Sequence, residues 1–539
     1  MKRRPPERIE LGIEELESIL DHATRERLSA EEHAKLKAAV DTLAFLTREI
    51  ESKGASIQRL RHLMFGAKTE TTRSVLGEGT GHGADRKDRR SRTKRKGHGR
   101  NGAAAYRSAE RVRVAHASLR PGNPCPDCAK GKVYAQSDPA VLVRVNGMAP
   151  LRATVYEMDR LRCHLCGKVF TAATPAGLGT EKYDETAASM IGLLKYGAGL
   201  PFHRLQQLER DLGIPLPAAT QWEVVQRAAG LLVPAYEELV RQAAQGEVLH
   251  NDDTAMKILD FTDAARAEAV PGAESQERTG VFTSGIVSLG GGQRIALFMT
   301  GPKHAGENLA TVLAHRAADR SPPIQMCDAL SRNTAGEFEA IVAHCLAHAR
   351  RRYVEVATSF PEECRYVLET LREVYRTDAR ARAKGLPPEE RLRLHQEESR
   401  PRMEQLEKWL REQIDQNQVE PNSGLGEAIG YMRKHWERLT LFLEVPGAPL
   451  DNNICERALK KAILHRKNAL FYKTENGARV GDVFMSLIHT AELCEANPFN
   501  YLVALQRHAD AVEHDPTVWM PWNFTEALER LAADATPPS

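Results

Sequence analysis

Hydrophobic residues near the start of the chain recur every seven positions. The repeat runs through Leu36, Leu43, Ile50, Ile57 and Met64. A seven-residue apolar repeat is typical of a coiled-coil seam, so we expect residues 1–68 to form a helical oligomerisation region and the protein to be a homo-oligomer. An amphipathic helix that packs on its own protein is the alternative, because it would produce a similar pattern.

Apolar residues follow a helical period between residues 181 and 245, where a Gly- and Pro-containing turn at 213–217 divides the segment. Two helices around such a turn are compatible with a helix-turn-helix DNA-binding module. Plain helical bundles contain the same arrangement, so the pattern leaves both interpretations open.

Strand patterns follow Gly246. In chain order we predict strands at 247–259, 280–289 and 293–300, a helix at 306–317, a strand at 323–326, a helix from about Ala335 and a last strand in the short apolar stretch before Arg350. Antiparallel strands followed by alternating helices and strands are the element order of the ribonuclease-H-like fold. An unrelated mixed sheet would show the same pattern and is the alternative.

The charge is distributed unevenly along the chain. Lys and Arg number 75 and Asp and Glu 72, which gives a net charge of +3. Nine of the fifteen residues from Arg86 to Arg100 are basic and one is acidic, so this window carries +8 and the remainder carries −5. Residues 69–108 lack apolar periodicity and predict a basic flexible linker that could neutralise nucleic-acid phosphates. The candidate DNA-binding residues of this linker are Arg89, Arg90, Arg92, Lys94, Arg95 and Lys96.

The chain contains no apolar run near the roughly 18 residues that a membrane span requires, so we expect no membrane association. The basic residues that follow Met1 precede no apolar signal region, which favours a cytoplasmic protein. Nine cysteines, four of them in two close pairs, indicate metal binding rather than a disulfide framework.

The paired cysteines predict one structural zinc ion. Cys125 and Cys128 form one knuckle, and Cys163 and Cys166 form a second one after 34 intervening residues. Four thiolates complete a tetrahedral zinc site and leave no open position for catalysis. His164 could replace one thiolate, and four unligated cysteines are the alternative interpretation. We therefore expect a zinc ribbon over residues 109–180.

Acidic side chains occur within and at the ends of the predicted elements, and an acid inside a central strand is costly to bury and therefore needs a reason. Asp252 and Asp253 lie within the first predicted strand, Asp328 closes the fourth, and Glu456 lies near the start of a helix that Asp451 or Asn452 could cap. Any one of them could be an ordinary cap or surface acid. Together they suggest a site for two divalent cations, which need several convergent carboxylates.

The chain resembles the transposases of the bacterial insertion sequence 66 family, a DDE transposase group, over nearly its whole length. The matching segments are Leu63 to Glu70, the paired cysteines, Tyr196 to Arg204, His250 to Thr254, Cys345 to Arg351, and Leu450 to Arg457 continuing to Arg466 to Asn468. The resemblance implies that the catalytic acids are Asp252, Asp328 and Glu456. Two departures stand out. Asp253 replaces the usual second-position Glu, so Asp252 and Asp253 are both candidates for the first acid, and the resemblance favours Asp252. Ala329 follows Asp328 where Gly is common. Asp319 is the rival for the second acid.

The resemblance further implies a transposase that binds the ends of an insertion sequence, cleaves DNA and transfers the strand into target DNA with two Mg²⁺ ions, for which Mn²⁺ could substitute. Asp252 would bridge the ions, while Asp328 and Glu456 would each hold one. His348 would help to position the DNA strand or would be a core histidine. Basic residues of the matching segments would contact DNA, namely Arg350, Arg351, Arg457, Lys460, Arg466 and Lys467. The partners would be double-stranded DNA and two small accessory proteins in the bacterial cytoplasm, at the nucleoid.

Two other functions stay open at this point. One is a DNA-binding regulator or an inactive transposase descendant, and the other is a ribonuclease-H-like nuclease without strand transfer. The expected fold class is multidomain α+β. Its predicted parts are a coiled-coil helix (1–68), a basic linker (69–108), a zinc ribbon (109–180), a helical DNA-binding module (181–245), a catalytic core in two parts (246–352 and 447–495), a helical insertion (353–446) and a helical C-terminus (496–539).

Overall fold

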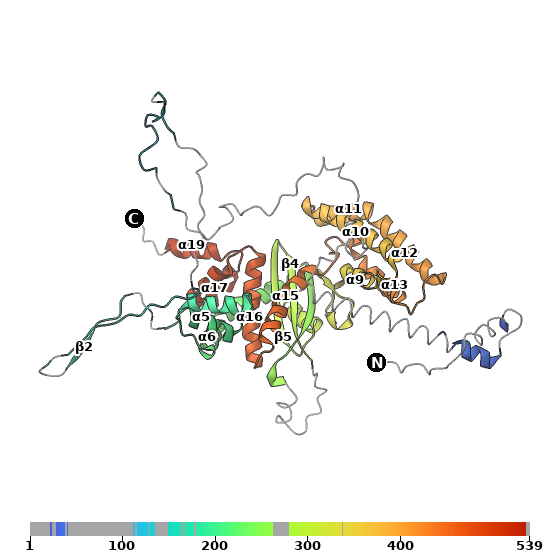
Figure 1. Ribbon diagram of the computed structural model, residues 1–539, viewed down its shortest axis with the longest axis horizontal. Helices are drawn as coiled ribbons and strands as arrows, with labels where there is room; N and C mark the ends of the chain where they lie inside the picture. The colour runs from blue at the N-terminus through green and yellow to red at the C-terminus, as the bar shows by residue number, and fades with distance from the viewer. Residues whose placement is uncertain are drawn as a thin grey trace, which may run out of the picture. The chain divides into compact units, whose positions relative to one another are not determined.

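The computed structural model describes residues 22–23, 29–37, 40, 112–113, 116–128, 130–134, 149–162, 164, 168–176, 179, 181–261, 280–336 and 338–534 (Figure 1). The chain divides into two compact units, residues 80–150 and residues 1–79 together with 151–539. In these described ranges, no helix has the length and apolar character that crossing a membrane requires. Mixed α and β structure confirms the expected α+β class.

A short helix at residues 30–37 begins inside the predicted coiled-coil region. The Glu32 amide donates to Ser29 Oγ (3.2 Å) and the Ser29 amide donates to Glu32 Oε2 (2.9 Å), which is a capping box. The hydrogen bonds from Ser29 lower the pKa of the Glu32 carboxyl to about 2. Most of the seam and the basic linker lie outside the described residues, so both stay predictions.

In the unit formed by residues 80–150, Cys125 and Cys128 lie in a tight turn. The Cys125 amide donates to the Gly131 carbonyl (2.7 Å) and closes the turn. Backbone N–H groups of Gly131 and Lys130 point at the Cys128 sulfur and lower the pKa of its thiol. A lowered thiol pKa favours the thiolate, which is the form that binds zinc.

In the other unit, a small hairpin pairs β1 (Arg160–Arg162) with β2 (Val169–Thr171) in antiparallel fashion. The connection between these strands contains Cys163 and Cys166 in the sequence. Both cysteines lie outside the described residues, so the four-cysteine zinc site stays a prediction.

The centre of the larger unit is a five-stranded mixed sheet in the order β5-β4-β3-β6-β7. The strands are β3 (Val248–Met256), β4 (Val281–Gly290), β5 (Gln293–Gly301), β6 (Ile324–Cys327) and β7 (Ile341–His344). The first three strands pair antiparallel, whereas β6 and β7 run parallel to β3. The β4–β5 hairpin turns at Gly291 and Gly292, whose positive φ angles of 57° and 79° suit glycine.

Helix α16 (Glu475–Leu493) covers the outer edge of β5 and satisfies its free backbone groups. The contacts are Ala296 N with Thr490 Oγ1 (3.1 Å), Phe298 N with Ser486 Oγ (2.9 Å) and Thr300 N with Asp482 Oδ2 (2.7 Å). The three helical partners are four residues apart, a rise of about 6 Å, and the three strand amides are two residues apart, about 6.6 Å, so each helical side chain meets one amide. This side of the sheet is therefore closed to further strand pairing.

One group of helices shares a hydrophobic core with β3, β4 and β5. They are α4 (Glu185–Gly192) with the π-helical turn η2 (Leu193–Gly197), α5 (Phe202–Asp211), α6 (Ala218–Ala243), α8 (Ala305–Leu313), α15 (Asn453–Ala469), α16, α17 (Pro498–Arg507), α18 (Ala509–His514), η6 (Pro516–Trp519) and α19 (Phe524–Asp534). The predicted helix-turn-helix segment forms α5 and α6, and α6 packs against β4 and β5. Residues 181–245 therefore belong to the same folded body as the sheet.

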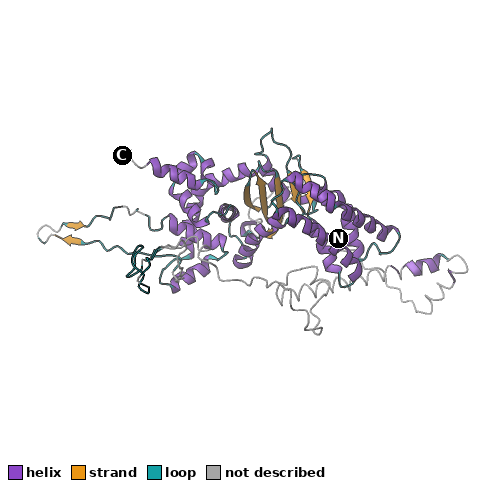
Figure 2. Ribbon diagram, turned by 90° about the horizontal axis from the view of Figure 1, so that it is seen from above, coloured by secondary structure: helices purple, strands orange, loops and turns teal. Residues whose placement is uncertain are grey.

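A second hydrophobic core joins β6 and β7 to the helices inserted between the second and third acids. These are α9 (Leu346–Val356), α10 (Pro361–Ala383), α11 (Pro388–Glu398), α12 (Arg400–Asp415), α13 (Gly424–Lys434), α14 (Trp436–Leu439) and the 3₁₀ turn η5 (Leu441–Leu443). Figures 1 and 2 show the sheet between this helical group and the group around α6, α16 and α17.

One predicted element is wrong. We expected a helix from about Ala335, but the chain forms the 3₁₀ turn η4 (Ser331–Asn333) and then strand β7, and a helix begins only at Leu346. Gly336 adopts a φ of 62°, which is incompatible with a continuing right-handed helix. The backbone at Thr334 also approaches Gly306 of α8 so closely that a Cβ there would lie 2.1 Å from the Thr334 carbonyl oxygen.

Candidate active site

The register between β3 and β6 places Asp252 beside Asp328. Val248 pairs with Ile324 and His250 with Met326 in this parallel ladder. Two further residues along each strand lead to Asp252 and to Asp328, which directly follows the end of β6. Partners in register carry their side chains on the same face, so the two carboxylates face the same way.

Helix α15 carries the third carboxylate, Glu456, in its first turn. The buried Asn452 fixes the start of the helix to β3, because its Nδ2 donates to the Asn251 carbonyl (3.0 Å) and its Oδ1 lies 3.1 Å from His250 Nδ1. Asp451 caps the turn by accepting from the Asn453 amide (3.1 Å).

The helix also lies unusually close to β4. The Cys455 thiol donates to the Gly285 carbonyl (3.2 Å), and a Cβ at Gly285 would lie 2.9 Å from Leu459 Cγ. The absence of a side chain at Gly285 therefore lets α15 approach the sheet and present Glu456 to the two aspartates.

The electrostatics of Asp252 show that the three acids interact. Burial raises the pKa of Asp252 to about 7, and the charges of Asp328 and Glu456 act in the same direction. The Asp253 amide donates to Asp252 Oδ1 (2.8 Å) and opposes this shift. Among the described residues, no basic side chain forms an ion pair with Asp252. The site is thus a group of mutually repelling carboxylates that a cation would stabilise.

Asp253 faces the other way, as expected for neighbouring residues of a strand. Its side chain is 4% exposed and pairs with His304 Nδ1 (2.9 Å) and, at 3.7 Å, with Arg332. The adjacent acid that made the first motif ambiguous therefore has partners of its own, and Asp252 is the one that joins the cluster.

Asp319, the rival for the second acid, lies far from this arrangement along the sheet. It occupies an exposed turn that precedes the amino end of β6, whereas Asp328 follows the carboxyl end of the strand. Asp328 is held in place, since its Oδ1 accepts from Asn333 Nδ2 (2.5 Å) and the Leu330 amide (3.1 Å).

Two residues of α9 border the third acid. His348 Nε2 lies 3.7 Å from Glu456 Oε1, and the Arg351 guanidinium lies 3.8 Å from Glu456 Oε2. Both separations exceed hydrogen-bond length, and Glu456 Oε1 is buried without a hydrogen-bond partner. His344, at the end of β7, is buried against the His435 ring, and this burial lowers its pKa to about 4.

The basic residues of α15 divide into two groups. Arg457, Lys460 and Lys467 are exposed and lie three and seven residues apart, so they share one face of the helix. Arg466 instead donates to Thr254 Oγ1 (3.0 Å) and to the Ala255 carbonyl, which ties α15 to the end of β3. Arg350 is half-buried on α9.

Sequence reasoning missed several residues that shape the site. His304 and Arg332 form ion pairs with Asp253. The sulfur of Cys345 accepts a hydrogen bond from the Asn452 amide (3.2 Å). No sequence spacing connects these residues, because their partners lie 51 to 107 positions away. Asn452 itself gave a signal in the sequence, because an amide side chain between two polar residues indicates hydrogen bonding at the start of a helix.

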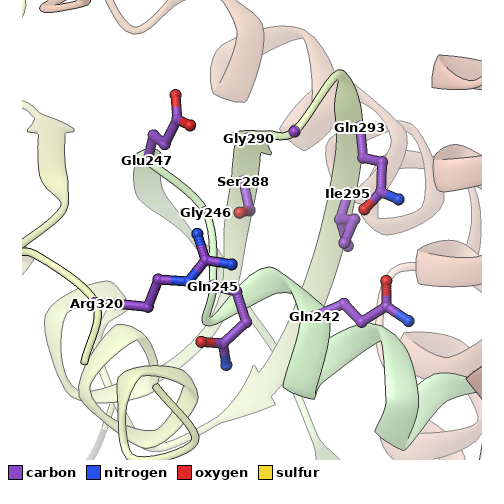
Figure 3. A pocket seen from close by; sticks show the side chains of 10 residues that line it. Gln242, Gln245, Gly246, Glu247, Ser288, Gly290, Gln293, Ile295 and Arg320 are labelled. Carbon is purple, nitrogen blue, oxygen red and sulfur yellow. The ribbon is translucent and has the colours of Figure 1, made fainter. Parts of the chain in front are cut away.

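A separate polar hollow lies at the other end of β3 (Figure 3). Gln242, Gln245, Glu247, Gln293 and Arg320 line it around the β4–β5 turn. None of the three clustered acids lines this hollow, so it is distinct from the carboxylate site.

A family model described as the IS66 family of transposases matches residues 182–480, which is more than half of the chain. The chain belongs to the IS66 transposase family. The matched segment runs from α4 into α16 and contains all three clustered acids. Membership in this family makes the protein a transposase by descent and gives the carboxylate cluster its context.

Relatives from Sinorhizobium fredii extend the similarity. Uncharacterized protein y4jD is 28% identical over 385 residues, which cover 68% of this chain and 71% of that protein. Uncharacterized protein y4hP is 26% identical over 400 residues, covering 70% and 69%. A third, uncharacterized protein y4qI, is 30% identical over 205 residues, or 36% of each chain. Their names state no activity, so the assignment rests on the IS66 match.

Proposed function

We propose that this protein is a DDE transposase that binds the ends of an insertion sequence, cleaves DNA phosphodiester bonds and joins the freed end to target DNA. The observation that carries the proposal is the meeting of Asp252, Asp328 and Glu456, from three separate elements, without a basic partner for Asp252 among the described residues. Membership in the IS66 family supports the same reaction class.

The sheet supports a ribonuclease-H-like core. Three antiparallel strands followed by two parallel ones, in the order β5-β4-β3-β6-β7, match the element order expected of that fold. Asp252 on the central strand and Asp328, which follows its parallel neighbour β6, then lie beside each other near the carboxyl end of β6. The insertion between Asp328 and Glu456 does not separate the three acids, because α15 packs back against β3 and β4.

The donor set fits divalent metal ions. Carboxylate oxygens are the ligands that Mg²⁺ prefers. The orphaned Glu456 Oε1 and the raised pKa of Asp252 support a cation site, because Arg351 and His348 stay beyond hydrogen-bond length of Glu456. Asp252 lies between the other two acids in this proposal and would hold both ions, while Asp328 and Glu456 would each hold one. When bound, two Mg²⁺ ions would supply charge stabilisation for an in-line phosphoryl displacement and a more acidic water.

The remaining residues of the site would bind and orient DNA. Arg457, Lys460 and Lys467 expose their charges on one face of α15 and would contact backbone phosphates. Arg350 and Arg351 of α9 would act beside them. Arg466 would position α15 through its bonds to β3.

Other parts of the chain would assemble the complex. A structural Zn²⁺ would be held by four cysteines, Cys125, Cys128, Cys163 and Cys166. The basic linker would bind duplex DNA, and the coiled coil would join copies of the chain. Two small accessory proteins would complete the machinery in the bacterial cytoplasm, at the nucleoid.

The test uses purified full-length protein, labelled duplexes of the element ends and Mg²⁺. Glu456→Ala should abolish cleavage, whereas Asp319→Asn, which removes an exposed acid outside the cluster, should retain it. Unchanged cleavage in Glu456→Ala would remove the acid cluster from the mechanism. Cleavage without joining to target DNA would favour a nuclease, and binding without cleavage in the presence of the accessory proteins would favour a DNA-binding regulator.

A further inference from the structure

Glu456 has a second group of neighbours besides the two aspartates. The sulfur of Cys345, an imidazole nitrogen of His348 and a carboxylate oxygen of Glu456 all lie within 4.8 Å of one another. Cys345 caps the amino end of α9, His348 lies in the first turn of that helix, and Glu456 lies in the first turn of α15. Two helix starts thus bring a thiol, an imidazole and a carboxylate to one point.

The spacing of these groups suits ligands of a shared cation. His348 Nε2 and Glu456 Oε1 are 3.7 Å apart, too far for a hydrogen bond. Ligand atoms bound at 2.0–2.3 Å to one tetrahedral ion lie about 3.3–3.8 Å from each other. Glu456 Oε1 is buried and without a hydrogen-bond partner, so the nearby His348 Nε2 does not satisfy it.

The backbone holds the three ligands at this spacing. The Leu346 amide donates to the Leu450 carbonyl (2.9 Å), and the Asn452 amide donates to Cys345 Sγ (3.2 Å). These bonds connect the start of α9 to the segment that leads into α15. Cys345 is fully buried, whereas the side chains of His348 and Glu456 are about one-quarter exposed, which leaves an approach from their side.

The chemistry of the ligand set differs from that of the three acids. Sulfur and imidazole nitrogen favour Zn²⁺, Co²⁺ and similar ions, whereas Mg²⁺ favours oxygen. Glu456 is common to both sets. An ion bound by Cys345 and His348 would therefore draw Glu456 away from the aspartates.

We propose that Cys345, His348 and Glu456 form a binding site for a thiophilic divalent cation such as Zn²⁺, and that its occupation inhibits the Mg²⁺-supported reaction. Burial raises the pKa of the Cys345 thiol to about 12, so the metal-free protein holds a neutral thiol, and the ion must displace its proton to solvent because the thiolate is the ligand. The inhibition rests on the proposed function, but the binding itself does not.

The binding test uses Co²⁺, whose bond to a thiolate produces a charge-transfer absorption band in the near ultraviolet. Metal-free full-length protein is titrated with Co²⁺ in the absence of DNA, and the spectrum of Cys345→Ser is subtracted so that cysteines elsewhere in the chain cancel. Wild type should bind one more thiolate-coordinated Co²⁺ than Cys345→Ser, and His348→Gln should weaken this binding at least tenfold. Cys364→Ser, which alters an equally buried cysteine in the insertion core, should match wild type.

Equal Co²⁺ spectra for wild type and Cys345→Ser would overturn the proposal, and so would a band that His348→Gln leaves at full strength. Circular dichroism of each variant checks its fold, and His348→Gln tests the site on a partly exposed side chain if Cys345→Ser does not fold. The same Co²⁺ titration of Asp252→Asn should retain the band, which separates this site from the three-acid cluster.

The functional arm measures the Zn²⁺ concentration that halves DNA cleavage at fixed Mg²⁺, relative to the activity of each variant without Zn²⁺. This concentration should rise at least tenfold in His348→Gln. An unchanged value would overturn the inhibitory role. If the wild-type protein does not cleave DNA at all, the proposed function fails, while the Co²⁺ result still decides the binding site.

Discussion

Two buried aspartates of this protein have opposite surroundings. Asp378, on α10 of the insertion, is 1% exposed and accepts hydrogen bonds from Arg382, Arg391 and His395. Burial alone would raise the pKa of Asp378, but the His395 hydrogen bond and the two arginine charges hold it below its usual range. Around Asp252, in contrast, the neighbours are Asp253, Asp328 and Glu456, and the pKa rises to about 7.

The difference is the one expected between an acid that serves stability and one that serves the proposed function. A buried carboxylate that serves stability is neutralised by cations of its own chain, as Asp378 is. A carboxylate among other carboxylates costs stability in the absence of a ligand, and folded proteins retain such sites where function requires them. We therefore expect substitutions at the two aspartates to change activity and stability in opposite ways.

The largest expected effect is on catalysis. Asp252→Asn should lower the rate of end cleavage by about a thousandfold or more, because one ligand of both ions loses its charge. Arg391→Lys, which preserves a charge beside Asp378, should cleave at close to the wild-type rate when the folded fractions are equal. Single-turnover cleavage of a labelled end duplex measures both rates, and similar rates for the two variants would refute the distinction.

The next effect is on stability. Asp378→Asn should lower the free energy of unfolding by about 3 kcal/mol, because the partly buried Arg391 and the buried His395 lose their carboxylate partner. Asp252→Asn should leave stability unchanged or raise it, since it removes mutual repulsion among acids. Urea denaturation at pH 8 without divalent ions measures both, and a destabilised Asp252→Asn protein would show that Asp252 has a structural role.

The pH dependence should distinguish the two acids as well. A folded-state pKa of about 7 for Asp252, above the ordinary value of 3.8, means that its contribution to stability is complete below about pH 4 and is lost as the pH rises through 7. The lowered pKa of Asp378 has the opposite sign, so its contribution is present above pH 4 and is lost in acid.

Burial also raises the pKa of Asp482, to about 8, so Asp482 changes the stability of the wild type with pH in the same direction as Asp252 does. The measurement is therefore the difference between wild type and Asp252→Asn in thermal unfolding from pH 5 to 9. This difference should grow by about 2 kcal/mol in favour of the variant as the pH rises. Saturating Mg²⁺ should reduce the difference, because it binds the wild-type site more tightly than the variant site, and a pH-independent difference would contradict the account.

The smallest effect concerns cations that are free to bind DNA. Lys460→Ala should weaken binding of end duplexes only a few-fold and reduce the slope of log affinity against log salt by about one. Arg382→Ala should leave that slope unchanged, because Arg382 is engaged with Asp378. Fluorescence anisotropy at several salt concentrations gives the slopes, and equal slopes for Lys460→Ala and wild type would exclude this face of α15 from DNA binding.

Local patterns predicted much of the catalytic sheet. Strand-like stretches located β3, β4 and β5 to within a few residues, and the glycine turn between the last two was correctly placed. The helix expected from Ala335 was wrong because Gly336 and the close approach of Thr334 to Gly306 are effects of tertiary packing. Such contacts leave no periodic signal in the sequence.

The site was predictable only in part, for a similar reason. The family resemblance named Asp252, Asp328 and Glu456 and favoured Asp252 over Asp253, but the sequence does not show which of these two side chains faces the other acids. That answer depends on His304 and Arg332, which reach Asp253 from elements distant in the sequence.

The most direct test of the central claim is a count of bound divalent ions by electron paramagnetic resonance of Mn²⁺, with an uncleaved end duplex present. Wild type and the exposed-acid control Asp319→Asn should bind two Mn²⁺ ions at the same affinity, whereas Asp252→Asn and Glu456→Gln should each lose at least one. Equal Mn²⁺ binding by all four proteins would contradict the assignment of these carboxylates as the metal site.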